Sequence, residues 1–475
     1  DGLDRLFSNM GLDIKYKPNS SHTIDISLNT DYAQAEAEDR LINITRYSIL
    51  QPEKREFFLE NSNFFSAATA DHIMFNSRNI GTESGQQVPL IGGIRLVGLS
   101  GGWQYGLLNM QSNGLASEGI SAKNFSVARV TKQIKDDESY IGTYFTHKNK
   151  TETGSANTVL GLDAVIRFDN SFILNSFFAN SSDRTLPSDH SNAFGFELSR
   201  YPQDGIEVSA RYYEYQENFN PDLGFLPRRN YTHSTYRAGY RFSFSDSFLS
   251  RLIIGNYHTF YYQASSHQHQ FIQHNMYYQF LFSSGAVMVI YLPMYQKDYV
   301  LQDWQFSKSV TVPVGEYAMD SFYLEYRSAK SAQYNYTVSV DYGDFYGGEK
   351  LILSGDLNFL FNQRFGMGLS YDVNSFEFPV SYTLGTDRRE TISLYTAKIK
   401  YNLNKSMSLN AYLQLDYNRK ELGSNLRFRY NFSEGNDLFL VYNQLLNTDI
   451  QAFQPEKPLI QNQVILLKYK YLLTI

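Results

Sequence analysis

The 475-residue chain contains no cysteine, which excludes structural disulfides, thiol-based catalysis and thiolate metal sites. It also lacks any run of about 20 apolar residues, the length that a membrane-spanning helix requires. The net charge of −6 gives no sign of a general affinity for nucleic acid. Charged residues make up 19% of the chain, whereas a typical soluble domain has about 25%. A membrane protein that crosses the bilayer without helices is compatible with the absence of cysteine, the absence of a long apolar run and the low fraction of charged residues.

Aromatic side chains are abundant, with 38 Tyr and 35 Phe, and they lie in segments where polar and apolar residues alternate. In 426–432, Leu426 and Phe428 share one face of an extended chain, whereas Arg427 and Arg429 share the other. The same alternation recurs in 236–245, 397–403 and 408–418. A two-residue period places successive side chains on opposite faces of a β-strand, so the pattern predicts strands.

The length of these segments favours an outer-membrane barrel over a soluble antiparallel sandwich or propeller, the alternative that also alternates. The segments run for about 10 to 14 residues, whereas soluble strands average about five or six. From residue 156 onward the links alternate between short and long, with 342–349 counted among the long ones. Short periplasmic turns and longer outer loops give this rhythm. We therefore predict an all-β fold, a transmembrane antiparallel outer-membrane β-barrel of about 24 strands (about 22 to 26) that forms one domain over 1–475.

The rhythm is less regular near the N-terminus. Extended segments are predicted at 12–17, 22–32, 41–47 and 72–79, and counting all of them gives an odd number. Because bacterial single-chain barrels normally have an even number, one early segment is expected outside the wall. The last strand, 464–475, follows a long link, so the C-terminus is expected in the periplasm.

Residues 48–71 are too long for a turn and are predicted to form a plug or a cap. They contain the charged and aromatic run Glu53, Lys54, Arg55, Glu56, Phe57 and Phe58. Such a segment beside a wide lumen can fold inward as a partial plug, because barrels of about 22 strands tend to have filled lumens. An ordered cap on the periplasmic end of the barrel is the alternative, and the rhythm of the links places the segment at that end.

Charged residues of both signs occupy the predicted inward faces and indicate a hydrated lumen. They are Glu325, Arg327, Asp356, Lys398, Lys400, Asp416, Arg427 and Arg429. Mixed charge suits a lumen that neither strongly attracts nor excludes one type of ion. It equally suits a lumen filled by salt-bridged plug elements.

The sequence contains no nucleophile elbow, phosphate loop or zinc-protease motif. His267, His269 and His274 cluster around a predicted outer loop, where exposed polar residues are a simpler interpretation than a metal site. The acidic group at 36–39 is interpreted as a solvated loop rather than a cation site. We expect no enzymatic activity, no metal and no cofactor.

Five motifs resemble an uncharacterised bacterial family. They are LNTDYAQAEAED at 28–39, NITR at 43–46, PEKREFFLEN at 52–61, VPLIGGIRLVG at 88–98 and GLLNMQ at 106–111. Members of this family join an N-terminal domain like a family-9 carbohydrate-binding module to a C-terminal outer-membrane barrel of unknown function. The resemblance implies that this chain is the barrel part and lies in the outer membrane of a Gram-negative bacterium. It carries over no catalytic residue.

Taken together, these features favour a conduit that imports or exports a bulky polar solute or a polypeptide, with a glycan-related cargo suggested by the resemblance. One alternative is a sealed structural anchor that holds a carbohydrate-binding domain or a partner protein. A second alternative is a membrane-embedded hydrolase with a triad assembled from distant strands. The expected partners are outer-membrane lipid, a glycan or polypeptide cargo and a partner protein, and nucleic acid is not among them.

Overall fold

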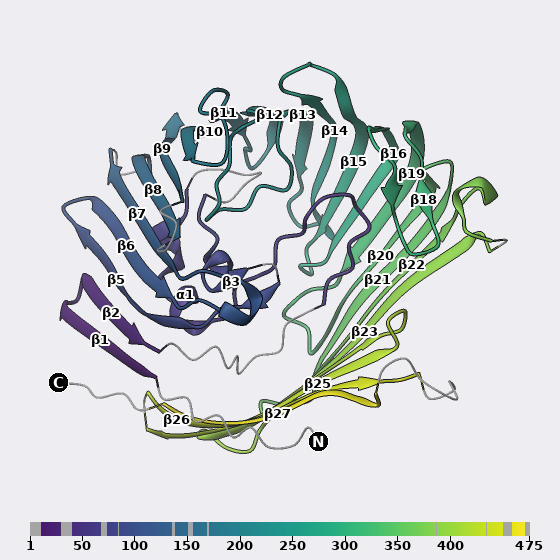
Figure 1. Cartoon of the computed structure of the whole chain (residues 1–475). Coiled ribbons are helices and arrows are strands. Elements are labelled where there is room, and N and C mark those ends of the chain that lie inside the picture. The colour runs from purple at the N-terminus through teal and green to yellow at the C-terminus, as the bar shows by residue number, and fades with distance from the viewer. Residues whose placement is uncertain are drawn as a thin grey trace.

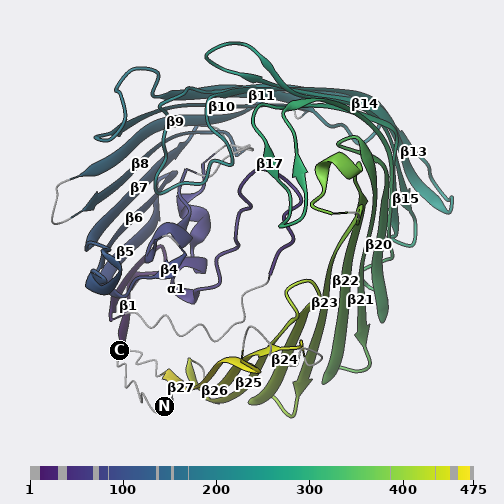
Figure 2. The ribbon, with the colours of Figure 1, turned by 45° about the vertical axis from the view of Figure 1, so that its right-hand side comes forward.

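The computed structural model describes residues 11–29, 40–67, 74–83, 85–134, 138–150, 155–168, 171–385, 387–433, 435–449 and 458–470. Its main element is one sheet of 23 strands that curves around a central space (Figures 1 and 2). No helix in these ranges is long and apolar enough to cross a membrane. The 23-stranded sheet confirms the prediction of an all-β fold.

Each strand of the sheet pairs antiparallel with its neighbours in chain order. The first strands are β1 (Leu12–Asn19), β2 (His22–Leu28), β5 (Leu90–Ser100), β6 (Trp103–Ser112), β7 (Lys123–Gln133), β8 (Tyr140–Lys150), β9 (Ala156–Phe168), β10 (Phe172–Asp183), β11 (Asn192–Arg200), β12 (Gly205–Tyr215), β13 (Tyr231–Ser243) and β14 (Leu249–Gln263). The sheet continues with β15 (His269–Phe282), β16 (Val287–Val300), β19 (Gly315–Arg327), β20 (Tyr334–Phe345), β21 (Gly348–Leu360), β22 (Phe365–Glu377), β23 (Arg389–Asn402), β24 (Met407–Asp416), β25 (Glu421–Ser433), β26 (Asn436–Asn447) and β27 (Ile460–Lys470).

Small elements lie between these strands. Two hairpins are formed by β3 (Thr82–Glu83) with β4 (Gln86–Gln87) and by β17 (Trp304–Gln305) with β18 (Thr311–Val312). The helical turns are α1 (Glu56–Leu59), η1 (Ser62–Phe65), η2 (Ser77–Asn79), η3 (Ala116–Glu118) and η4 (Val380–Tyr382).

The two faces of the sheet differ in polarity as the alternation predicts. On the outer face, Leu426, Leu440 and Ile465 are 41%, 45% and 69% exposed. On the opposite face of β25, Asn425 is buried, and its amide donates a hydrogen bond to Asn443 on β26 at 2.5 Å. Apolar side chains thus remain uncovered on the convex face, whereas polar ones pair on the concave face.

The concave face also carries apolar clusters, and each is covered by a segment that leaves the sheet. Phe58 and Phe65 pack with residues of β5, β6 and β7. A second cluster gathers around β8 to β13 and includes Phe219 from the loop before β13. The third packs Val310 and Val312 of the β17–β18 hairpin against β19, β20 and β22. The core of the protein is therefore on the inner side of the curved sheet.

The links at one end of the strands are mostly longer than those at the other, but two of them, 346–347 and 417–420, are short. The link predicted as long at 342–349 is a turn of two residues, Tyr346 and Gly347, between the paired residues Phe345 and Gly348. Both turn residues have positive φ, at 46° and 81°. A two-residue turn whose residues both have positive φ matches the right-handed twist of the strands that it joins. Two residues are therefore enough to connect β20 and β21.

The early segments give a second correction, because two of them rather than one lie outside the sheet. Segments 12–17 and 22–32 correspond to β1 and β2, but 41–47 and 72–79 contain no strand in their described residues. Asn43 accepts hydrogen bonds from the backbone and hydroxyl of Thr45, which turns the chain locally.

The two outermost strands run in the same direction, because β1 is the first and β27 the last of 23 antiparallel strands. In the described part of the chain they form no ladder with each other. Direct pairing of the two would have to be parallel. The closed barrel and its total number of strands stay predictions.

The connection that contains 48–71 lies at the end of the sheet where the long links are. Its predicted placement at the end with the short turns is therefore wrong. Residues 20–21 join β1 to β2 and residues 101–102 join β5 to β6 at the short-turn end. The chain between β2 and β5 therefore leaves and re-enters the sheet at the opposite end. The predicted placement assumes that 41–47 and 72–79 are strands. Without these two strands, the alternation of short and long links places 48–71 at the opposite end.

Candidate functional site

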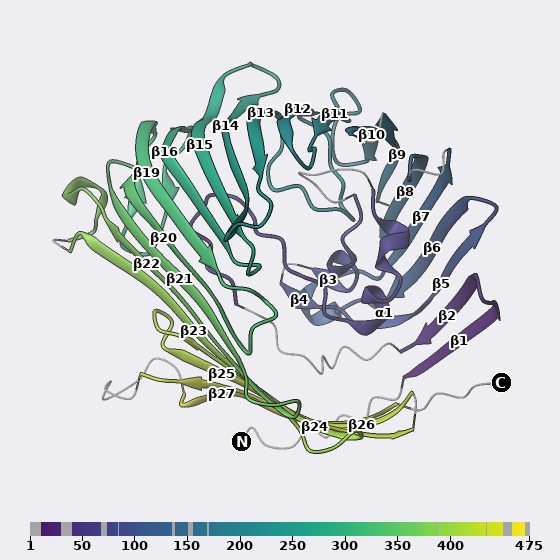
Figure 3. The same cartoon turned by 180° about the vertical axis from the view of Figure 1, so that it is seen from behind.

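Residues 40–67, which we call the strap, lie inside the curve of the sheet and contact it at widely separated strands. The strap is the purple trace within the sheet in Figures 1 and 3. It contacts β24 and β25, then β16, and finally β5 to β7. These strands lie far apart in the order of the sheet, so the strap spans the enclosed space.

The first anchor of the strap is Arg40. Its Nη1 lies 2.7 Å from Oε2 of Glu421 on β25 and 3.6 Å from Oδ2 of Asp416 on β24. The backbone N–H of Arg40 also donates to Oε1 of Gln414 at 3.0 Å. Glu421 and Gln414 are buried, so the contact holds both the charge and the backbone of Arg40 at this wall.

The second anchor is Arg46, whose Nη2 lies 2.6 Å from Oδ1 of the buried Asp298 on β16. Burial by itself lowers the pKa of Arg46, but the attraction of Asp298 outweighs it and raises that pKa. The hydroxyl of Tyr346 donates to the other oxygen of Asp298. Next in the strap, the ring of Tyr47 lies 3.6 Å from the guanidinium of Arg228, in the loop before β13.

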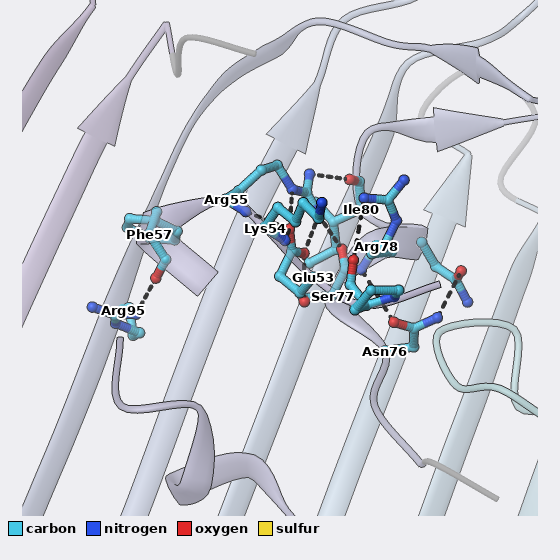
Figure 4. A network of polar contacts seen from close by, with 11 residues as sticks. Glu53, Lys54, Arg55, Phe57, Asn76, Ser77, Arg78, Ile80 and Arg95 are labelled. Carbon is cyan, nitrogen blue, oxygen red and sulfur yellow. Dashed lines mark hydrogen bonds and ion pairs between the residues drawn. The ribbon is translucent and has the colours of Figure 1, made fainter. Parts of the chain in front are cut away.

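The third anchor is a clamp around Glu53, shown in Figure 4. Nη2 of Arg55 lies 2.6 Å from Oε2 of Glu53, and the hydroxyl of Ser77 donates to the same oxygen at 2.6 Å. Arg55 also donates to the carbonyl oxygens of Ser77 and Ile80 at 2.6 and 2.7 Å. Burial raises the pKa of Glu53, but the hydrogen bonds and charge of Arg55 outweigh it and leave that pKa below its ordinary value.

The clamp is expected to loosen in acid. A carboxyl whose pKa is lowered by folding stabilises the folded form above its ordinary pKa of 4.5, and this contribution disappears as the pH falls through the lower, folded value. A nitroxide label at the exposed Gln51, introduced as Gln51→Cys, should therefore become more mobile as the pH falls below 4.5 and through the lower, folded pKa of Glu53. With Glu53→Gln added, the label should be mobile throughout that range. A label whose mobility does not change with pH while Glu53 is present contradicts the clamp.

The fourth anchor is apolar and includes α1 and η1. Phe58 and Phe65 are buried against the inner side of β5 to β7. Arg95 on β5 donates to the carbonyl oxygen of Phe57, as Figure 4 shows, and to that of Glu60 at 2.6 Å. Arg95 is itself held by Asp25 on β2, which lies directly opposite in the strand register, with Nη2–Oδ2 at 2.6 Å.

Beneath the end of the strap lies a buried ion pair between β7 and β9. Nη1 and Nη2 of Arg129 bind the two oxygens of Asp163 at 2.5 and 2.7 Å, and Nε donates to the carbonyl oxygen of Ser66 at 3.1 Å. The two side chains are 1% and 0% exposed. Gly142 on the intervening β8 makes room, because a Cβ there would lie 2.3 Å from Nη1 of Arg129.

The predicted plug residues divide between these anchors. Glu53 and Arg55 form the clamp, and Phe57 and Phe58 of α1 belong to the apolar cluster on β5 to β7. Glu56, the first residue of α1, is exposed, and Lys54 faces a cavity described below. The described part of 48–71 thus packs on the concave face, whereas residues 68–71 lie outside the described residues.

Strand register places the predicted lumen residues on the same face as Asp416, which binds Arg40 of the strap. Glu325 and Arg327 pair with each other at 2.7 Å. Arg429 pairs with Asp437 at 2.7 Å. The face also includes Asp356, Lys398, Lys400 and Arg427. Their role in lining a lumen stays a prediction.

Sequence reasoning missed the strap anchors Arg40 and Arg46 and their partners Glu421 and Asp298. Arg40 lies outside the predicted strands, Arg46 lies in the predicted segment 41–47 that forms no strand, and Glu421 is 381 positions from Arg40. A signal existed only for Asp25 and Arg95, because opposite charges at matching positions of adjacent strands form cross-strand pairs.

The histidines give no site with three ligands. Nδ1 of His274 lies 2.7 Å from Nδ1 of His258, a residue that was not among the candidates. Among the residues that the structure describes, no three His, Asp or Glu side chains are grouped so that they can hold a metal ion. The acidic group at 36–39 lies outside the described residues.

A model for a domain of unknown function, DUF5916, matches residues 3–90. No curated protein matches the chain in sequence. Among solved structures, the siderophore receptor PirA from Acinetobacter baumannii is 9% identical with a TM-score of 0.44, over 78% of this chain and 77% of that one. The copper transporter OprC is 9% identical with a TM-score of 0.39, over 76% and 67%. The outer-membrane protein OpdK from Pseudomonas aeruginosa is 10% identical with a TM-score of 0.34, over 69% and 91%.

Proposed function

We propose that the chain forms a closed barrel in the bacterial outer membrane and acts as a conduit that the strap closes. The placement rests on the convex face, where large apolar side chains such as Leu160, Leu162, Phe196 and Ile465 are uncovered. Soluble monomers rarely expose contiguous apolar patches larger than a few hundred Å². A face of this kind is stable when lipid chains cover it.

The observation that carries the proposed conduit is the strap itself. It crosses the enclosed space from β24 and β25 to β5, held by the ion pairs of Arg40 and Arg46 and by hydrogen bonds from Arg95. Because these anchors lie on strands far apart in the order of the sheet, the strap occupies the enclosed space rather than following one wall.

The proposed cargo is a bulky polar solute or a polypeptide. A wall of more than 20 strands encloses a lumen wide enough for such a cargo, and barrels of this size need an internal element to close them. The long links are assigned to the outer surface, so β27, which follows a long link, runs toward the periplasm. A glycan cargo and a neighbouring carbohydrate-binding domain remain part of the proposal, which gives the chain no catalytic step.

A sealed anchor is the second candidate, because four separate anchors hold the strap. The two functions differ in planar-bilayer conductance once the strap is disordered. A conduit then carries a steady current, whereas a sealed anchor stays silent as long as other elements fill its lumen.

A further inference from the structure

A cavity of about 710 Å³ lies on the concave side of β20 to β25. Four cationic side chains line it, namely Lys54 from the strap, Lys398 and Lys400 from β23, and Arg427 from β25. Within the described residues, no carboxylate is part of the lining. The cavity is therefore a pocket of one charge sign in a protein whose net charge is negative.

The local sequence makes room for this cluster. Lys398 and Lys400 lie directly opposite Gly368 and Gly366 on β22, so no side chain of that strand covers them. On the other side, the ring of Tyr412 lies 5.4 Å from Nζ of Lys398. The lysines share one face of a strand and are two positions apart, a spacing of about 7 Å.

Acidic side chains on the same face of the sheet, among them Asp356 on β21, lie outside the lining of the cavity. Asp416 on β24 lies near Arg40 of the strap, and Asp437 on β26 pairs with Arg429 at 2.7 Å. Neither Lys398 nor Lys400 forms an ion pair within the part of the chain that the structure describes. The lining of the cavity therefore contributes four positive charges and no negative one.

We infer that this cavity binds a soluble polyanion carrying at least two carboxylate or phosphate groups. Two such groups about 7 Å apart can each bind one of the paired lysines, and Arg427 adds a planar donor suited to either group. Lys54 belongs to the strap, so a bound polyanion contacts both the strap and the wall. The inference rests on the proposed function, since it names the chemical class of a solute that enters the conduit.

The test is isothermal titration calorimetry on the full chain in detergent, with citrate and tripolyphosphate as separate probes at low salt. Lys398→Gln with Lys400→Gln should weaken binding of at least one probe about 100-fold, since each lost charged hydrogen bond contributes about tenfold. Lys330→Gln with Lys405→Gln is the matched control, because it removes the same charge from two short turns. The control should bind within about twofold of the unmodified chain. Binding of one probe alone identifies carboxylate or phosphate as the preferred group.

Two outcomes overturn the inference. One is that neither probe binds the unmodified chain, and the other is that both double variants bind equally well. A far-ultraviolet circular dichroism spectrum that shows intact strand content ensures that lost binding is not lost folding. Conductance tests the conduit separately. If neither probe binds but the variant with a glycine–serine linker in place of residues 40–52 carries a current, only the anion site is refuted. Binding without current in that variant refutes the conduit alone.

Discussion

Replacing residues 40–52 with a glycine–serine linker of equal length is expected to raise the steady planar-bilayer conductance roughly tenfold or more. The linker removes Arg40, Arg46 and Tyr47, and with them the contacts to β24, β25, β16 and the loop before β13. It leaves Glu53, Arg55 and α1 in place, so the packing of Phe58 against the wall is retained. A disordered linker leaves room for water and ions that the anchored strap excludes.

Two companion variants make this result specific. A glycine–serine replacement of the exposed loop 184–190 should leave the conductance unchanged. Arg40→Gln with Arg46→Gln should give a smaller increase, because it removes two ionic anchors and keeps the bulk of the strap. A folded linker variant that remains as silent as the unmodified chain contradicts the role of the strap as the closing element.

Arg129→Met is expected to destabilise the fold by about 3–5 kcal/mol, the largest effect of any single side chain considered. The substitution leaves the carboxylate of Asp163 buried and without its bidentate partner. Unfolding in urea, followed through the fluorescence of Trp103 and Trp304, measures the change. Arg419→Met is the matched control, because Arg419 is exposed and lies 3.6 Å from Asp416, so its loss should cost no more than about 1 kcal/mol.

The double variant Arg129→Met with Asp163→Leu adds a second comparison. Replacing both members of a buried ion pair by apolar side chains is often nearly neutral, so the double variant should recover most of the lost stability. Equal destabilisation by Arg129→Met and Arg419→Met would show that burial of the pair does not matter to the fold.

The strands could be predicted from the sequence because alternation is a local property. Residues such as Leu426 and Arg427 reveal their faces through their immediate neighbours, and Asp416, Lys398 and Arg427 were assigned to one face that the register also gives them. The two-residue turn at Tyr346 and Gly347 was missed because its positive φ values are a backbone property that a search for linker length does not detect.

The strap could be placed only in part. The charged and aromatic run from Glu53 to Phe58 indicated a segment apart from the strands, but alternation gives no information about where such a segment packs. Arg40 of the strap pairs with Glu421 on β25, and Arg46 pairs with Asp298 on β16. Contacts between residues so far apart in the chain depend on the curvature of the whole sheet. The early strand count failed for a related reason, since 41–47 turns through the hydrogen bonds of Asn43.

Lipid contact of the convex face is tested most directly by nitroxide labels at single cysteines, which the cysteine-free chain accepts without a background signal. Labels at 426, 427, 428 and 429 in lipid vesicles should collide alternately with oxygen, which dissolves in the bilayer, and with a water-soluble nickel complex. We expect oxygen to dominate at Leu426 and Phe428 and nickel at Arg427 and Arg429. Nickel access at all four positions, or the opposite phase, would show that water rather than lipid covers the convex face.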